Sequence, residues 1–229
     1  MFTSVIIPAA GAGERMGATV SKQFLALRGK PIIIHTLERF QMCGAVDEIV
    51  IAVQPSSRQQ VEYLLKEFHI SKASKIAEGG KRRQDSVANS LRLLHPRSDI
   101  VIVHDAVRPF IQQRVILDSL EKAKLHSAAV VAVRVKDTVK IGNDKGFVER
   151  TLDRSLLWSA QTPQTFRRQV LLDAYANAAR ENIEATDDAS LVERIGINPA
   201  IVEGSFENIK ITTPGDLDFA EVLAGRFKD

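Results

Sequence analysis

The chain has 229 residues, of which 45% are hydrophobic and 26% are charged, a composition typical of a globular protein with a sizeable core. Its formal net charge of +3 is small for this length, and no apolar run approaches the ~20 residues that span a bilayer, so we expect neither a nucleic-acid nor a membrane partner. The single cysteine, Cys43, excludes an intrachain disulfide framework and fits a reducing compartment. We therefore expect a cytoplasmic protein, and its N-terminus lacks the basic and long apolar regions of a secretory signal.

Apolar runs and helical periodicities alternate through the first 135 residues. In chain order they predict a strand at residues 5–8, a helix at 32–42, a strand at 48–53, helices at 57–70 and 84–94, a strand at 100–104, a helix at 114–126 and a strand at 128–135. Strands that alternate with helices in this way are typical of a parallel sheet that is covered on both faces.

A hairpin pattern interrupts this alternation after residue 135. Apolar side chains alternate with polar ones around Val139 and Ile141, the turn-forming sequence GNDKG follows, and Phe147 and Val148 begin a second run. A lone hairpin is marginally stable in water, so this segment needs a surface to pack against. We expect a β-arm at about residues 137–152 that packs on its own domain or on a partner chain.

The remaining chain resumes the alternation. It predicts a helix at residues 167–182, a strand at 200–203 and a last helix after Pro214 and Gly215. The sequence contains neither a linker nor an internal repeat. The whole pattern predicts one α/β domain over residues 1–229, with a Rossmann-like, mostly parallel sheet, helices on both faces and a projecting β-hairpin arm.

The first predicted strand ends at a glycine-rich loop. Pro8 is followed by the sequence AAGAG, whose small side chains allow backbone N–H groups to approach phosphates closely. The dinucleotide fingerprint fails because Met16 occupies its third glycine position, and the P-loop motif fails because no lysine follows Gly17. Two cations, Arg15 and Lys22, lie in or just after the loop. This combination favours a ligand with several phosphates.

Longer motifs resemble those of one enzyme family. The chain contains, in order, PAAGAGERMG, KQFLALRGKPII, GGKRRQDSV, VHDAVRPF, DRSLLWSAQTPQTF, TDDASLVE and NIKITTPGDL. From about residue 3 to about residue 224 it resembles the 2-C-methyl-D-erythritol 4-phosphate cytidylyltransferases of the non-mevalonate isoprenoid pathway. The resemblance implies transfer of CMP from CTP to that phosphorylated polyol with release of pyrophosphate, Mg²⁺ as cofactor, and a homodimer formed through the arm.

The same resemblance implies roles for individual residues. The catalytic residues would be Arg15, Lys22, Arg154 and Lys210. CTP would contact Pro8, Ala9, Ala10, Gly11, Gly13, Gly80, Ser86, Asp105 and Ala106. The acceptor would contact Asp105, Arg108, Thr138 and Thr186. Mg²⁺ would be held mainly by phosphate oxygens, with Asp105 as the candidate protein ligand.

Two other functions stay open on sequence grounds. Ribitol-5-phosphate cytidylyltransferases share most of these motifs, although PAAGAGERMG and SLLWSAQTPQ look more like the methylerythritol enzymes. A nucleotide-binding module without catalysis is the second alternative. The presence of Arg15, Lys22 and Lys210 argues against it, since a degenerate copy would be free to lose them.

Several of these residues also have purely structural interpretations. Asp85 or Ser86 would cap a helix, and Thr186 would cap another. We interpret His104 as structural, because an acceptor phosphate is ionised near pH 7 and needs no general base. The other histidines are scattered, which argues against a metal-binding cluster.

Overall fold

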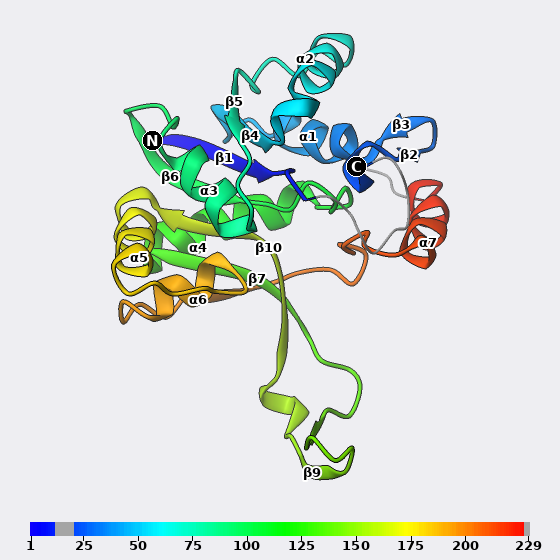
Figure 1. Ribbon diagram of the computed structural model, residues 1–229, viewed down its shortest axis with the longest axis vertical. Coiled ribbons are helices and arrows are strands. Elements are labelled where there is room, and N and C mark those ends of the chain that lie inside the picture. The colour runs from blue at the N-terminus through cyan, green and yellow to red at the C-terminus, as the bar shows by residue number, and fades with distance from the viewer. Residues whose placement is uncertain (12–20, 227–229) are drawn as a thin grey trace.

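The computed structural model describes residues 1–11 and 21–226, and its centre is a seven-stranded sheet in the order β11-β7-β10-β6-β1-β4-β5 (Figure 1). The strands are β1 (Phe2–Pro8), β4 (Glu48–Val53), β5 (Lys75–Glu78), β6 (Ser98–Val103), β7 (Ala128–Arg134), β10 (Trp158–Arg167) and β11 (Ala200–Glu203). Only β10 runs antiparallel to its neighbours in this sheet, so the predicted mostly parallel arrangement is confirmed.

Helices cover both faces of the sheet, as the sequence predicts. One face carries α1 (Ile32–Met42), α2 (Arg58–Glu67) and α4 (Gln113–His126), and the other carries α3 (Arg83–Leu91), α5 (Arg168–Arg180) and α6 (Asp188–Glu193). Short 3-10 turns form η2 (Lys22–Phe24), η3 (Pro55–Ser57) and η4 (Arg154–Leu156). Within the described residues, every helix is too short or too polar to span a lipid bilayer.

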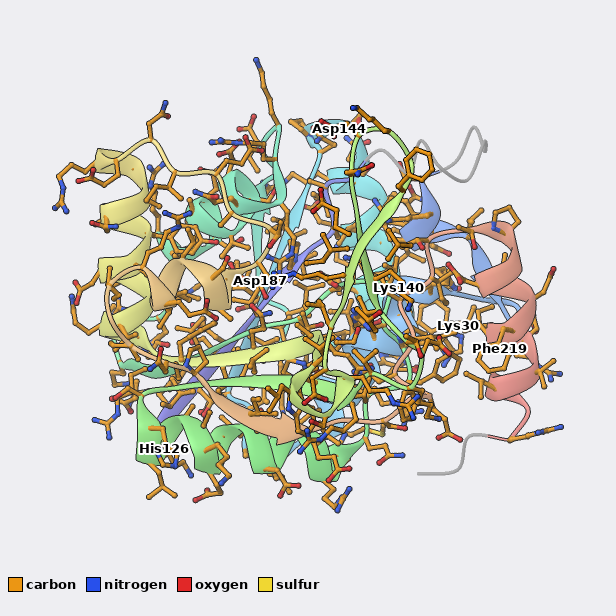
Figure 2. All side chains as sticks on the ribbon, turned by 90° about the horizontal axis from the view of Figure 1, so that it is seen from below. Lys30, His126, Lys140, Asp144, Asp187 and Phe219 are labelled. Atoms are coloured by element: carbon orange, nitrogen blue, oxygen red, sulfur yellow. The ribbon has the colours of Figure 1, made fainter. Side chains whose placement is uncertain are left out.

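A third, smaller layer lies at one side of the sheet. The helix α7 (Pro214–Ala224) packs beside the two short strands β2 (Ala26–Leu27) and β3 (Lys30–Pro31) around a separate apolar cluster. Figure 2 shows Phe219 of α7 at one side of the molecule and α5 at the opposite side.

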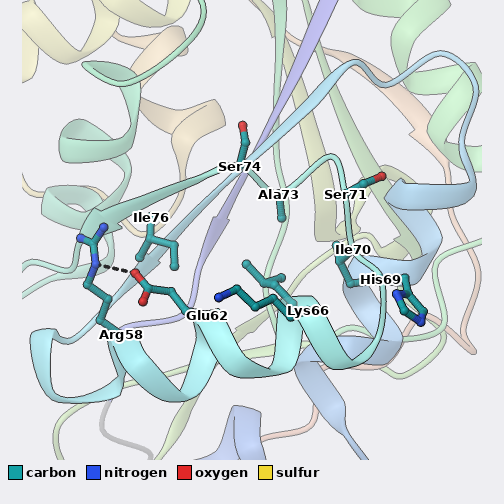
Figure 3. A pocket seen from close by; sticks show the side chains of 10 residues that line it. Arg58, Glu62, Lys66, His69, Ile70, Ser71, Ala73, Ser74 and Ile76 are labelled. Carbon is teal, nitrogen blue, oxygen red and sulfur yellow. Dashed lines mark hydrogen bonds and ion pairs between the residues drawn. The ribbon is translucent and has the colours of Figure 1, made fainter.

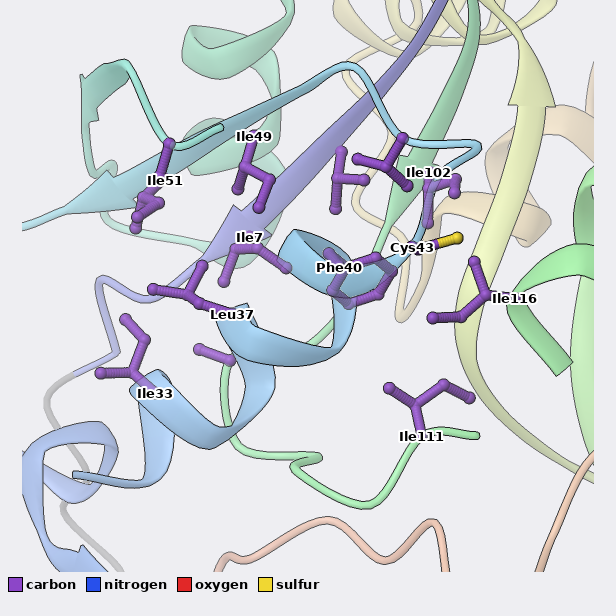
Figure 4. Close-up of a cluster of buried hydrophobic side chains, with 14 of the residues drawn as sticks. Ile7, Ile33, Leu37, Phe40, Cys43, Ile49, Ile51, Ile102, Ile111 and Ile116 are labelled. Atoms are coloured by element: carbon purple, nitrogen blue, oxygen red, sulfur yellow. The ribbon is translucent and has the colours of Figure 1, made fainter. Parts of the chain in front are cut away.

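The alternation of buried side chains along β1 explains how the sheet holds both helical layers. Val5 and Ile7 belong to one apolar cluster with Phe40 of α1, whereas Ile6 belongs to the cluster on the opposite face. Figure 4 shows Ile7 and Phe40 in the first cluster, beside Leu37. Strands buried on both faces read as continuous apolar runs, which is why the sequence reveals them.

The short strands β2 and β3 and two strands of the central sheet, β5 and β10, were not predicted, and α6 was indicated only by a candidate cap. The strand β5 has only four residues, and β10 contains Pro163 and a run of buried polar side chains. The pairing of β10 with β7 breaks between Ala160 and Gln164, which leaves room for a proline that cannot donate to the ladder. The six-residue α6 begins after Asp187, whose side chain accepts a hydrogen bond from the Ser190 N–H.

The predicted hairpin, β8 (Lys140–Gly142) and β9 (Val148–Thr151), forms an arm that projects from the body of the protein (Figure 1). At the base of the arm the Arg134 guanidinium, at the end of β7, lies 4.1 Å from the centre of the Trp158 ring, at the start of β10. This cation–π contact joins the segments that enter and leave the arm. The large apolar side chains that stay exposed on the arm and beside it are Phe147, Val148 and Leu156.

Candidate active site

A pocket of about 180 Å³ lies at the carboxyl ends of β1 and β6, where ligands of open α/β sheets bind. Of the residues predicted from the sequence it gathers Pro8, Ala10, Gly11, Lys22, Gly80, Ser86, Asp105, Ala106 and Lys210. Lining residues that the sequence analysis did not single out are Gln23, Lys81, Arg82, Arg83 and Val107. The fold thus brings four distant segments of the chain to one place.

The start of the glycine-rich loop is anchored from inside the protein. The Gln23 side-chain amide donates to the carbonyl oxygen of Ala9 over 2.7 Å, and Gln54 donates to that of Ala10 over 3.0 Å. Ala9 is itself buried and does not line the pocket, so its expected contact with CTP would be through the backbone at most. Gly13 and Arg15 lie outside the described residues.

Two glycines allow the loops to approach each other closely. A Cβ atom on Gly79 would lie 2.1 Å from the Cβ of Ala10, and one on Gly80 would lie 2.2 Å from the Cβ of Asp85. The Gly80 N–H donates to the Ser86 hydroxyl oxygen over 3.0 Å, so that hydroxyl holds the loop against α3. The carboxylate of Asp85 accepts a hydrogen bond from the Arg82 N–H at the start of the same helix. This segment therefore both caps α3, through Asp85, and lines the pocket, through Gly80 and Ser86.

Asp105 is the centre of charge in the site. Its carboxylate follows β6 and is almost buried, and it contacts three cations. Arg83 Nε donates to Oδ1 over 3.2 Å, Arg108 Nε donates to Oδ2 over 3.3 Å, and Lys210 Nζ lies 2.9 Å from Oδ2. Burial alone would raise the pKa of Asp105, but these cations outweigh it and hold that pKa well below its ordinary value. The carboxylate therefore stays ionised.

Backbone pairing explains how Lys210 reaches this carboxylate. The N–H of Ile211 donates to the carbonyl oxygen of Val107 over 3.0 Å, which joins the segment before α7 to the loop after β6. Arg108 is turned inward, since its Nη1 also donates to the carbonyl oxygen of Asn208 over 2.8 Å. Arg108 therefore supports the site from behind and does not line the described pocket.

His104 lies behind the site in a hydrogen-bond arrangement that fixes its protonation. Its Nε2 lies 3.1 Å from the carbonyl oxygen of Arg108, which can only accept, so Nε2 carries the hydrogen. Nδ1 then accepts from the Thr162 hydroxyl over 3.1 Å, and that hydroxyl oxygen accepts from the Asp105 N–H over 3.0 Å. Burial lowers the pKa of His104 to about 4, so the ring is neutral near pH 7. The geometry agrees with a structural role.

The remaining predicted residues do not line the pocket. Thr138 lies just before β8 of the arm, and Arg154 begins η4, after the arm. Arg154 Nη1 donates to the carbonyl oxygen of Lys136 over 2.7 Å. Thr186 is exposed just before α6. The capping interpretation of Thr186 is wrong, because Asp187 supplies the cap.

One signal in the sequence could have revealed Arg83. A helix N-terminus disfavours cations, yet Arg82 and Arg83 stand directly at the start of α3. Such a placement indicates nearby carboxylates, and both arginines do pair with aspartates. Thr162, by contrast, carries no signal that periodicity or charge would reveal.

A larger hollow of about 510 Å³ lies between α2 and the segment that leads into β5 (Figure 3). Its described lining contains none of the residues predicted for the site, and its Arg58 and Glu62 pair with each other over 2.9 Å. This hollow is larger than the pocket beside Asp105, but the converging cations and the glycine loops favour the smaller pocket.

The smaller pocket offers few protein ligands for a divalent cation. Asp105 is the one carboxylate among its described lining residues, and no cluster of three or more His, Cys, Asp or Glu side chains suited to a metal occurs in the described parts of the chain. Mg²⁺ commonly binds through one or two carboxylates together with substrate phosphates and water. The residues present fit a metal that is brought in largely by a phosphorylated ligand.

These features define an α/β fold with a cation-rich pocket at the carboxyl ends of its strands. A family model described as IspD, 2-C-methyl-D-erythritol 4-phosphate cytidylyltransferase, matches residues 3–226. The chain belongs to the 2-C-methyl-D-erythritol 4-phosphate cytidylyltransferase family.

Individual relatives resemble the chain over nearly its full length. The 2-C-methyl-D-erythritol 4-phosphate cytidylyltransferase of Clostridioides difficile is 48% identical, over 96% of this chain and 92% of its own length. That of Geobacillus kaustophilus is 46% identical over 100% of both chains. Among solved structures, 4-diphosphocytidyl-2C-methyl-D-erythritol synthase from Anaerococcus prevotii has a TM-score of 0.87 at 29% identity, covering 98% of this chain and 96% of that one. The Thermus thermophilus cytidylyltransferase has a TM-score of 0.80 at 34% identity, covering 98% and 100%.

The neutral state of His104 predicts a pH dependence of stability. Unfolded chains bind a proton at histidine near pH 6.5, whereas folded His104 resists protonation down to about pH 4, so stability falls as the pH drops between these values. We expect this group to lower the free energy of unfolding by about 2 kcal/mol between pH 7 and pH 5. Chemical denaturation of wild type and His104→Gln at both pH values measures it. His126→Gln, at an exposed position, is the control, and equal pH slopes for wild type and His104→Gln would refute the assignment.

Proposed function

We propose that the chain transfers CMP from CTP to 2-C-methyl-D-erythritol 4-phosphate and releases pyrophosphate, as a step in non-mevalonate isoprenoid synthesis. The proposal rests on one observation above all. Lys22, Lys210 and Asp105 converge beside the glycine-rich loop, in a chain that belongs to this family.

The reaction requires two anions to meet. An oxygen of the acceptor phosphate attacks the α-phosphorus of CTP, the bond from that phosphorus to the oxygen bridging to the β-phosphate breaks, and pyrophosphate leaves with the electron pair. The acceptor phosphate is ionised near pH 7, so no side chain has to remove a proton. The protein therefore acts by positioning the reactants and stabilising charge.

The pocket residues divide between the two substrates. Lys22, together with Arg15, stabilises the charge that grows on the α-phosphate. Lys210, whose ammonium is held 2.9 Å from Asp105, brings the acceptor phosphate toward it. The Gly80 and Ser86 segment, which lines the pocket with small residues, takes the cytosine.

Mg²⁺ is part of the proposal as a cofactor. Both oxygens of Asp105 already contact cationic side chains, so the triphosphate and water would provide most of the ligands, with Asp105 as the one candidate from the described pocket. When bound, the ion would neutralise phosphate charge and so reduce repulsion between the reactants.

We also propose a homodimer in which the arm of each protomer reaches the acceptor side of its partner. Thr138 and Arg154 do not line the described pocket, and Phe147 exposes 70% of its surface. The partner's Arg154 would then place the acceptor phosphate, while Thr186 contacts the acceptor from the same chain as the pocket. A cytoplasmic location fits the single reduced thiol, Cys43.

Pyrophosphate release tests the function directly. Purified protein with CTP and Mg²⁺ is offered 2-C-methyl-D-erythritol 4-phosphate or ribitol 5-phosphate, and UTP replaces CTP as a control. We expect release with the first acceptor and CTP, and little with UTP, because the wrong base leaves polar groups of the site unpaired. Preference for ribitol 5-phosphate would replace the proposed substrate, and release with neither acceptor would reject the proposed reaction.

Kinetics of Lys22→Ala and Arg15→Ala test the catalytic assignment. If these cations stabilise charge that grows in the transition state, kcat should fall by about 10²–10³-fold while the KM for CTP changes little. Lys66→Ala, a lysine substitution outside the pocket, is the matched control. A defect confined to KM that fades with added salt would instead identify surface cations that only attract CTP.

A mixing experiment tests whether two chains share a site. Arg154→Ala and Lys22→Ala chains are each expected to be nearly inactive. Random mixing should recover about one quarter of wild-type activity, since about half the dimers are heterodimers and each has one intact site of two. If the mixture is no more active than the separate variants, or if a fully active monomer sediments at assay concentration, the shared site is rejected.

A further inference from the structure

Arg83 joins the pocket to a second buried carboxylate outside it. From the first turn of α3, its Nε donates to Asp105 Oδ1 over 3.2 Å, and its Nη1 donates to Asp188 Oδ2 over 2.7 Å. Asp188 stands in the first turn of α6 and is only 1% exposed. One guanidinium therefore bridges two carboxylates that belong to different elements.

The far end of this bridge is fixed independently of the pocket. The Tyr175 hydroxyl of α5 donates to Asp188 Oδ1 over 2.6 Å, and the Asp188 N–H donates to the Gln164 side-chain oxygen of β10 over 3.0 Å. Burial raises the pKa of Tyr175 well above its ordinary value, so the hydroxyl keeps the proton that it donates. Asp188 is thus a rigid anchor for Arg83.

The contact between Arg83 and Asp105 determines the orientation of the Asp105 carboxylate. Arg83 occupies Oδ1, which leaves Oδ2 toward the ammonium of Lys210 and the guanidinium of Arg108. Without Arg83 the carboxylate would lose the partner that the described residues give to Oδ1. The carboxylate could then rotate, and Oδ2 would move away from the ammonium of Lys210. A shift of about 1 Å in a positioned group can lower a rate by about 10²-fold.

We propose that Arg83 is a positioning residue, which orients the carboxylate of Asp105 by bridging it to Asp188 and so fixes the ammonium of Lys210. The kinetic part of this inference rests on the proposed function. The bridge needs a planar fork of donors, because a lysine ammonium is a single point of charge on a flexible stem.

A purely structural role makes a different prediction. In that case Arg83 would only neutralise Asp188, since a buried carboxylate that loses its partner destabilises the fold. Removing both charges, in Arg83→Met/Asp188→Asn, would then restore stability and activity together. Under the positioning role it restores stability alone, because Asp105 still lacks its partner on Oδ1.

The experiment measures the melting temperature, kcat and both KM values for Arg83→Met, Arg83→Lys and the double variant. We expect the double variant to melt near wild type with kcat lowered about 10²-fold, and Arg83→Lys to lose about tenfold or more in kcat although it keeps the charge. Arg168→Met is the control: it removes an arginine of α5 that donates to the carbonyl oxygen of Pro96 and does not line the pocket, so it should change kcat by about twofold or less.

Two results would overturn the inference: wild-type kcat in the double variant, or wild-type kcat in Arg83→Lys. Crystal structures of wild type and the double variant give a readout that needs no turnover. We expect a rotated Asp105 and a lost Lys210 contact, and an unmoved Asp105 would again refute the inference. If wild type itself releases no pyrophosphate with either acceptor, the proposed function fails, and the crystallographic comparison still decides the role of Arg83.

Discussion

One buried carboxylate, Asp105, holds the site together. It stands at the end of β6, a strand with neighbours on both sides, so its backbone is fixed by the sheet. Three cationic side chains reach it from α3, from its own loop and from the segment before α7. Without the carboxylate these like charges would repel one another in a partly buried place. With it they are held in position before a phosphorylated ligand arrives, so little reorganisation is needed during the reaction.

The rest of the fold supplies the surfaces around this charge cluster. Buried strand ends place the loops after β1, β5 and β6 side by side, and Gln23 and Gln54 anchor the first of them through its carbonyl oxygens. Gly79 and Gly80 let the loops approach within distances that any side chain would prevent. A negatively charged ligand in this pocket would therefore meet Lys22, Arg83 and Lys210 in one small volume, an arrangement that suits phosphoryl chemistry.

Much of this could be predicted from the sequence, because double-sided burial and helical periodicity leave clear patterns. The strand β4 was predicted with its observed bounds, and α1 was predicted from the helical pattern after Pro31. The strand β10 could not be predicted, because it contains polar side chains such as Gln164, which in a sequence are typical of the surface. In the fold Gln164 is buried, and its side-chain oxygen accepts hydrogen bonds from the first N–H groups of α6. Arg83 was missed although two arginines at the start of α3 are a signal in the sequence, because that signal does not identify their partners. Its partners lie 22 and 105 residues away along the chain, and only the tertiary fold brings them within reach.

The turnover of Asp105→Asn tests most directly whether this carboxylate organises the site. Asparagine keeps the shape of the side chain but removes the charge that holds the three cations. The account predicts that kcat at saturating CTP and acceptor falls by about 10²-fold or more, with the fold intact by circular dichroism. A kcat close to that of wild type would contradict the account, because it would show that the cations keep their positions without Asp105.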